Sequence, residues 1–202
     1  MLHIIGKIPH NVTVACSGGL DSMSIVQFLL NGKRNVTVAH FNHDTVHSKD
    51  AQSFVQNYCE NKKIKLHIGH VRGSRKKQSL EEFWRNERYK FFNSLETNFI
   101  ITGHHLDDAV ETWVMSSLHG QPKLIPYKRG KNIYRPFLLT SKRSFHDFSL
   151  EKNIEWVEDP SNQSCSHIRN LVRHKIIPEA LKVNPGLRKT IRKKIIELYK
   201  NI

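Results

Sequence analysis

Short apolar runs alternate with longer amphipathic or polar segments over the first 118 residues, and this alternation limits the chain to few folds. The apolar runs have the length of buried strands: Val12–Ala15, Val36–His40, Ile64–Ile68 and Phe99–Thr102. The segments that follow them have helical length: Leu20–Asn31, Lys49–Asn61, Ser79–Ser94 and Asp107–Leu118. Strands separated by helices are typical of a parallel sheet covered on both faces. We therefore predict an α/β fold, a doubly wound, Rossmann-like parallel sheet with strand order 3-2-1-4.

The pattern changes after Gly120. Residues Gln121–Pro136 contain three prolines and are predicted to form a loop with at most a short strand. Three helices are predicted beyond it: Ser141–Lys152, His167–Ile177 and Gly186–Ile202. We expect a nucleotide-binding domain over residues 1–135 and a small helical C-terminal extension over 136–202, packed on the same domain.

The charge of the chain indicates a polyanionic partner. There are 32 Lys and Arg residues against 18 Asp and Glu, a formal net charge of +14. Such an excess costs self-repulsion, and nucleic acid is the leading candidate for the partner that offsets it. Three basic runs are candidate phosphate contacts, Arg72–Lys77, Lys128–Lys131 and Arg188–Lys194. A basic protein with merely solvated charged faces is the alternative.

Hydropathy and cysteine usage indicate a cytoplasmic protein. No apolar run approaches the roughly 20 residues that span a bilayer, so we expect no membrane partner. The first 20 residues lack the pattern of a signal peptide. Cys16, Cys59 and Cys165 cannot all pair and form no CxxC motif. We expect them to be structural thiols.

The stretch VTVACSGGLDSMS (Val12–Ser24) contains the first candidate binding site. A predicted strand runs into Ser17-Gly18-Gly19, and a helix then begins. Backbone N–H groups at a helix N-terminus bind anions, and glycines let an anion approach the backbone closely. The stretch is not a Walker A loop, because GxxxxGK[ST] is absent. It therefore predicts a phosphate site of another kind.

The sequence SGGLDS (Ser17–Ser22) resembles the SGGxDS motif of the pyrophosphatase-loop (PP-loop) ATP enzymes, which cleave ATP between its α- and β-phosphates. Six further stretches follow in order: AHFNHD (Ala39–Asp44), SLEEFWRNERYKFF (Ser79–Phe92), GHHLDDAVET (Gly103–Thr112), RPFL (Arg135–Leu138), EDPSN (Glu158–Asn162) and RNLVRHKIIP (Arg169–Pro178). Together they are similar to the bacterial tRNA(Ile)-lysidine synthetase family, from Val12 to about Asn184. The family's fold is of the adenine-nucleotide α-hydrolase type, as the alternation predicts.

This resemblance implies a ligase that forms a C–N bond. ATP would adenylate the C2 oxygen of the first anticodon cytidine in a CAU-anticodon isoleucine tRNA. The amine of free L-lysine would then displace AMP and leave lysidine. ATP and Mg²⁺ are the cofactors implied, and tRNA(Ile) is the macromolecular partner.

The resemblance also implies residue roles. The ATP-binding residues would be Ser17, Gly18, Gly19, Leu20, Asp21, Ser22, His40, Asn42, His43, Gly103 and His104. The metal ligands would be Asp21, Asp107 and Asp108, since Mg²⁺ prefers one or two carboxylates together with phosphate oxygens. Simpler functions stay open: Asp21 caps a helix, Asn42 caps a turn, and Asp107 and Asp108 stabilise a helix dipole.

The same motifs give candidate catalytic and RNA contacts. The catalytic residues would be Asp107, Asp108, Arg85, His105 and Glu111. The tRNA-binding residues would be Arg88, Arg135, Arg169, Asn170, Arg173, Arg188 and Lys189. Arg85 and Arg88 lie on one helix face, where they either neutralise phosphate charge or form surface salt bridges. Glu111 either positions the lysine amine or forms an ion pair on its helix.

Two departures from the family bear on tRNA selection. We expect a short form without the usual C-terminal domains, and a contracted segment, HGQPKLIPYKRG, follows the helix of the GHHLDDAVET motif. The basic C-terminal helix or a homodimer would then take over part of the tRNA contact. Two other functions remain as alternatives, a tRNA thiolase of the same superfamily and a non-catalytic tRNA-binding module.

Overall fold

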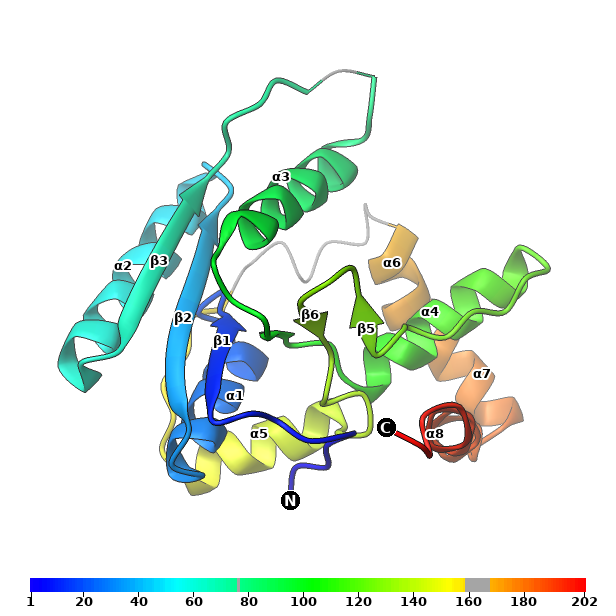
Figure 1. Ribbon diagram of the computed structural model, residues 1–202. Helices are drawn as coiled ribbons and strands as arrows, with labels where there is room; N and C mark the ends of the chain where they lie inside the picture. Colours follow the sequence, from blue (N-terminus) through cyan, green and yellow to red (C-terminus); the bar gives the residue numbers. More distant parts are fainter. Residues whose placement is uncertain (76, 159–167) are drawn as a thin grey trace.

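A computed structural model describes residues 1–75, 77–158 and 168–202 and contains one six-stranded sheet (Figure 1). The strand order is β3-β2-β1-β4-β6-β5. The strands are β1 (Asn11–Ala15), β2 (Asn35–Asn42), β3 (Lys65–His70), β4 (Ile100–Thr102), β5 (Lys128–Arg129) and β6 (Ile133–Tyr134). Every pairing is parallel except that of β5 with β6. The predicted parallel sheet and its 3-2-1-4 order are confirmed.

Helices cover both faces of this sheet. Helices α1 (Leu20–Asn31), α2 (Val46–Lys62) and α5 (Lys142–Glu151) contribute to one buried cluster with the strand residues Val14 and Val38. Helix α3 (Leu80–Ser94) covers the other face through a cluster that contains Ala39 of β2. Val38 and Ala39 point to opposite faces because side chains alternate along a strand. The short apolar runs are thus buried on both sides.

A second group of helices packs beside the sheet rather than on it. Helix α4 (Leu106–Leu118) contacts α8 (Leu187–Leu198). Between them in sequence lie α6 (Ile168–Leu171), a π-helical turn (Val172–Ile176) and α7 (Ile177–Val183). Three apolar residues of α8, Leu187, Ile191 and Ile195, are buried in this second cluster. The basic C-terminal helix is therefore a core element as well as a charged surface.

The helix predicted over His167–Ile177 ends too early, because the structure continues it as α7 to Val183. Pro178 follows directly after the predicted end, and proline lacks the N–H that a helix interior requires. In the structure Pro178 stands in the first turn of α7, directly after the π-helical turn. A first turn leaves its N–H groups without helical partners, so proline costs little there.

The boundary predicted at residues 135 and 136 falls inside the fold's main core. Phe137 and Phe145 lie beyond it, and both are fully buried in the cluster that contains β1 and α1. Their rings contact each other at 5.7 Å between centroids. The division into residues 1–135 and 136–202 stays a prediction.

No helix within the described ranges is long and apolar enough to cross a membrane. Cys16 and Cys59 are buried free thiols, and burial raises the pKa of each, for Cys59 to about 12. Both therefore pack as the structural thiols expected. Cys165 lies outside the described residues, as does most of the EDPSN stretch.

Candidate active site

Three loops meet at the carboxyl ends of neighbouring parallel strands. They follow β1, β2 and β4 and carry the SGGLDS, AHFNHD and GHHLDDAVET stretches. Gly103 shows how closely they approach. A Cβ built on it would lie 3.8 Å from the Asp21 Cβ and 3.9 Å from the Ser22 amide nitrogen. Such an edge, where the chain turns from one side of β1 to the other, is the binding crevice of doubly wound sheets.

The loop after β1 is built as an anion cradle. Gly18 has φ +85°, a conformation that glycine adopts without strain. The Ser17 amide donates to the Ser22 hydroxyl at 3.2 Å, and that hydroxyl donates to the Gly19 carbonyl at 2.9 Å. Gly19 caps α1 without any side-chain hydrogen bond. The first-turn amides of α1 therefore remain available for phosphate oxygens, which fits ATP.

The AHFNHD stretch, which covers the end of β2 and the start of the loop after it, offers a buried acceptor beside this cradle. The Nδ1 of His40 lies 2.9 Å from the Cys16 carbonyl, which can only accept, so Nδ1 carries the proton. Burial lowers the pKa of His40, so its Nε2 is an unprotonated acceptor. That nitrogen has no hydrogen-bond partner within the described part of the chain. A buried orphan acceptor fits a ligand that brings its own N–H group, such as a nucleobase amine.

The other two candidates in this stretch are held by their neighbours. The Asn42 amide donates to Gln52 at 2.7 Å, and its oxygen accepts from the Asp44 amide at 2.7 Å. The turn-capping function left open for Asn42 is thus present. The ring of His43 contacts Phe41 and Trp84, with centroids 5.0 and 5.4 Å apart. Neither contact involves the SGGLDS loop.

Three carboxylates surround the imidazole of His105. Its Nε2 lies 3.8 Å from Asp21 and 3.6 Å from Asp108, and its Nδ1 lies 3.9 Å from Asp107. His105 and Asp108 also cap α4 reciprocally, since the His105 amide donates to Asp108 at 3.0 Å. The three carboxylates predicted as metal ligands therefore come together around one buried histidine.

Cations from the second half of the chain hold these carboxylates. Lys142 Nζ donates to both oxygens of Asp21, at 2.8 and 2.7 Å, and Arg188 donates to Asp107 at 3.0 Å. Arg173 reaches Asp108 at 3.5 Å. Although burial acts to raise it, the pKa of Asp108 is lowered by the nearby histidines, its backbone hydrogen bond and Arg169. Asp108 is thus an ionised carboxylate.

Glu111 anchors the C-terminal helices to this cluster. Its side chain is only 2% exposed and accepts hydrogen bonds from Arg169 and from two nitrogens of Arg173. Arg169 also donates to the Thr112 hydroxyl at 3.3 Å. The ion pair left open for Glu111 is therefore formed, though with residues of α6 and the π-helical turn rather than along its own helix.

The donor chemistry of the cluster fits Mg²⁺ only in part. No group of three His, Cys, Asp or Glu side chains in the described ranges is arranged as a ready metal site. Mg²⁺ requires fewer protein ligands than that, because substrate phosphates and water supply the rest. Asp21 and Asp107 flank the phosphate cradle from two helices and would serve as those ligands.

His104 lies at the edge of the acidic cluster, where its Nδ1 is 3.0 Å from the Thr102 hydroxyl. Burial lowers the pKa of His104 to about 3, an effect that Asp108 opposes and that Arg135, Arg169 and Arg88 reinforce. We expect its ring resonances in NMR spectra to stay constant between about pH 7 and 4.5, while the urea-unfolded chain titrates near 6.5. Stability is then lost as the pH falls from 6.5 towards 3, because only the unfolded state takes up the proton.

A His104→Gln variant identifies the resonance and provides the control for stability. Its unfolding free energy should depend less steeply on pH between 6.5 and 4 than that of the wild type. A His104 signal that titrates near 6.5 in the folded protein would contradict the expected burial.

Four arginines gather around Tyr89 on the α3 side of the sheet. Arg129 lies over the Tyr89 ring at 3.8 Å, with Arg88 at 5.8 Å and Arg85 at 6.0 Å. Arg135 is 3% exposed and donates to the Tyr89 hydroxyl at 3.3 Å. The contacts of Arg85 and Arg88 are thus with Tyr89, not with the carboxylates around His105.

Several functional residues are absent from the sequence-based candidates. Lys142 is the clearest example. It is the first residue of α5, where a lysine opposes the helix dipole, and this unfavourable position could have indicated that its charge pairs with a carboxylate elsewhere. Glu87 is another: its buried carboxylate accepts from the Arg72 and Gly73 amides and from Lys90, so it fixes the basic loop that follows β3. The Lys90 hydrogen bond lowers the pKa of Glu87 most, and the two amides add to the effect.

The remaining tRNA candidates lie on the C-terminal helices. Lys189 is exposed on α8, and Asn170 is half-buried on α6. Residue 76 of the basic run Arg72–Lys77 lies outside the described residues. Whether these residues contact RNA stays a prediction.

Comparison with known proteins gives consistent matches. The sequence pattern of the PP-loop domain matches residues 3–180. A tRNA(Ile)-lysidine synthase from Staphylococcus aureus is 34% identical over 190 residues, which are 85% of this chain and 44% of that protein. One from Persephonella marina is 34% identical over 195 residues, 87% of this chain and 42% of that protein. The chain thus spans less than half the length of these relatives.

The fold also has a solved counterpart. The U34-tRNA thiolase NcsA from Methanococcus maripaludis, solved with its [4Fe-4S] cluster, superposes with a TM-score of 0.75. The match covers 97% of this chain and 74% of that one, at 20% sequence identity. At that identity the likeness shows the shared fold alone.

Proposed function

The chain belongs to the PP-loop domain family, and from this premise we propose that it ligates lysine to a tRNA at the expense of ATP. The substrate we propose is a CAU-anticodon isoleucine tRNA, with lysidine as the product at its first anticodon base. Relatives that are 34% identical are named tRNA(Ile)-lysidine synthases, and the net charge of +14 suits a polyanion. Such a reaction belongs to the cytoplasm, where tRNA is found.

One observation carries the proposal: the phosphate cradle and the acidic cluster adjoin at one sheet edge. Asp21 belongs to both, since it stands in the first turn of α1 and lies 3.8 Å from His105. A ligase of this kind must hold an anionic phosphate chain next to a cationic amine. The amides of α1 suit the phosphates, and the carboxylates of Asp107 and Asp108 suit the lysine amine or Mg²⁺.

The reaction divides into two balanced steps. In the first, the C2 oxygen of the cytidine attacks the α-phosphate of ATP and pyrophosphate leaves into the Ser17–Gly19 turn. In the second, the lysine amine attacks C2, AMP departs with the oxygen, and the amine loses a proton. We assign transfer of that proton to His105, whose ring nitrogens lie 3.6 to 3.9 Å from three carboxylates. Asp21 and Asp107 would hold Mg²⁺, and the chemistry that it would supply when bound is neutralisation of phosphate charge.

Positively charged side chains would stabilise the adenylated intermediate and hold the RNA. Arg85 and Arg88 stand with Arg129 and Arg135 around Tyr89, and two of these four charges, Arg88 and Arg135, act on His104. We assign this arginine cluster to the phosphates of the tRNA or of ATP. We assign Glu111 a positioning function, because both of its oxygens are engaged by Arg169 and Arg173.

The test uses the 202-residue protein, ATP with Mg²⁺, labelled lysine and a CAU-anticodon isoleucine tRNA transcript. We expect label in the RNA, located by digestion and mass spectrometry at the first anticodon base. A matched transcript with uridine at that base should remain unlabelled. Thiolated nucleoside in place of lysidine would favour a thiolase, and tRNA binding without any ATP consumption would favour a non-catalytic binding module.

A further inference from the structure

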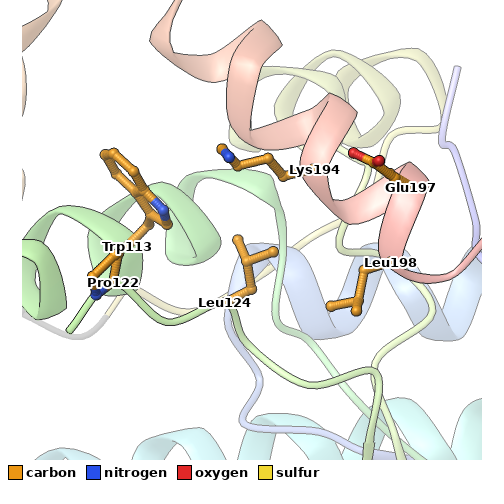
Figure 2. Close-up of a pocket in the computed structure, with 6 residues that line it drawn as sticks. All are labelled: Trp113, Pro122, Leu124, Lys194, Glu197 and Leu198. Atoms are coloured by element: carbon orange, nitrogen blue, oxygen red, sulfur yellow. The ribbon is translucent and has the colours of Figure 1, made fainter.

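A shallow hollow of about 390 Å³ lies between α4 and α8, away from the carboxylates around His105. It is lined by Trp113 of α4, by Pro122 and Leu124 of the following loop, and by Lys194, Glu197 and Leu198 of α8 (Figure 2). Figure 2 shows the Trp113 indole on one side of Leu124, Glu197 and Leu198 on the other, and Lys194 above Leu124 with its amine end toward Trp113. Trp113 is half-buried, and Leu198 is 57% exposed. The hollow is thus a mostly apolar surface with an aromatic wall and a charged rim.

This chemistry suits a nucleobase. Unstacked bases of single-stranded RNA bind by stacking on aromatic side chains, with cationic side chains on the adjoining phosphates. Trp113 offers the aromatic face, and Lys194 is the cation on the rim of the hollow. Glu197 on the same rim is a hydrogen-bond acceptor for a base amine.

The surrounding charge favours RNA over a second protein molecule. Helix α8 carries five cations, Arg188, Lys189, Arg192, Lys193 and Lys194, against the single acid Glu197. Lys123 is exposed between the lining residues Pro122 and Leu124. Two copies of a chain with a net charge of +14 would repel each other here, whereas a phosphate backbone would be attracted.

The position of the hollow suits the same RNA that enters the active site. Trp113 follows Asp107 by six residues on α4, and Lys194 follows Arg188 by six residues on α8. Six residues of helix span about 9 Å. Asp107 and Arg188 themselves form an ion pair at 3.0 Å. At the roughly 3.4 Å spacing of stacked nucleotides a strand covers this rise in two or three steps, and a more extended, unstacked strand needs at most that number.

We propose that the Trp113 hollow binds an unstacked nucleobase of the RNA substrate, two or three nucleotides from the reacting base, with Lys194 on its phosphate. The proposal rests on the proposed function for the identity of that RNA. The hollow then sets the direction in which the anticodon loop crosses α4 and α8.

The experiment measures binding of the tRNA transcript and of anticodon stem-loops that carry 2-aminopurine at single loop positions. In the wild type we expect fluorescence quenching at one position near the first anticodon base. Trp113→Ala should abolish the quenching and weaken binding about 5- to 150-fold, the range for loss of one base–aromatic stack of about 1–3 kcal/mol. Trp113→Phe should retain both, and Leu150→Ala, an exposed apolar truncation on α5, should change neither.

Lys194→Ala tests the phosphate contact without disturbing the apolar cluster, because this side chain is exposed. The slope of log K against log salt should fall by about one. Unchanged RNA affinity and quenching in Trp113→Ala would overturn the proposal. So would a Trp113-dependent dimer in sedimentation together with unaltered RNA binding, since the hollow would then join two copies.

These outcomes are separable from failure of the proposed function. At saturating tRNA, Trp113→Ala should still incorporate lysine at nearly the wild-type rate, with only KM for tRNA raised. If the wild type incorporates no lysine but binds RNA in a Trp113-dependent way, the nucleobase site stands and the ligase assignment fails.

Discussion

An Asp108→Asn variant is expected to lose lysine incorporation by about 100- to 1,000-fold, a loss as large as that from removing one preorganised hydrogen-bond donor from an active site. Asp108 is the carboxylate closest to His105, and its environment holds its pKa low, so the substitution removes a full negative charge. Asparagine keeps an oxygen that accepts the His105 amide, so the cap of α4 is retained. The measurement is single-turnover ligation under saturating ATP, lysine and tRNA.

The matched control for this substitution is Asp147→Asn on α5. Asp147 forms an exposed ion pair with Arg143, and such pairs contribute little. It should keep wild-type activity, and circular dichroism of both variants should match the wild type. Asp108→Asn with activity within threefold of the wild type would remove Asp108 from the catalytic residues.

A Phe137→Ala variant is expected to lower the free energy of unfolding by about 3–5 kcal/mol, the cost of truncating a fully buried aromatic side chain. The Phe137 ring contacts Phe28 of α1 and Phe145 of α5, each at 5.7 Å between centroids. Its removal therefore affects both halves of the chain. Urea unfolding, followed by tryptophan fluorescence and by far-ultraviolet circular dichroism, measures the loss.

The same experiment tests the division at residues 135 and 136. Residues 136–202 are predicted to pack on the same domain; if they instead formed a separable unit, the two signals would give different midpoints and only one would move. We expect both midpoints to move together. Phe148→Ala, which removes a partly buried ring at the edge of the same cluster, should cost clearly less. If the two variants lost equal free energy of unfolding, Phe137 would not lie nearer the centre of the core than Phe148.

The sequence predicts best those elements whose signals are local. Helix α1 begins and ends at the predicted residues, because a glycine stands at each boundary and the apolar face has helical spacing. The strands and helices of the first 118 residues were likewise predicted from local alternation, and the doubly wound fold typical of that alternation has the observed 3-2-1-4 order. In each case a short stretch contained the necessary information.

The features that were missed depend on contacts between distant segments. The hairpin of β5 and β6 extends the sheet because Ile133 pairs with Ile100, and two-residue strands have no periodicity to detect. Lys142 meets Asp21 across 121 positions of sequence. The pairing of each carboxylate with a C-terminal cation likewise depends on how α4 meets α6 and α8, which residue spacing alone does not specify.

The central position of β1 also has a consequence for synthesis of the chain. Thr13 pairs with Thr37 on one side and with Ile100 on the other. About ninety further residues must therefore be synthesised before the second edge of β1 can pair. At about 5–20 residues per second, that synthesis takes roughly 4 to 18 s on the ribosome. An apolar strand with an open edge is a template for wrong pairing during this interval. Slower elongation between β2 and β4 would therefore lower the yield of native protein, while the molecules that do fold would keep their stability.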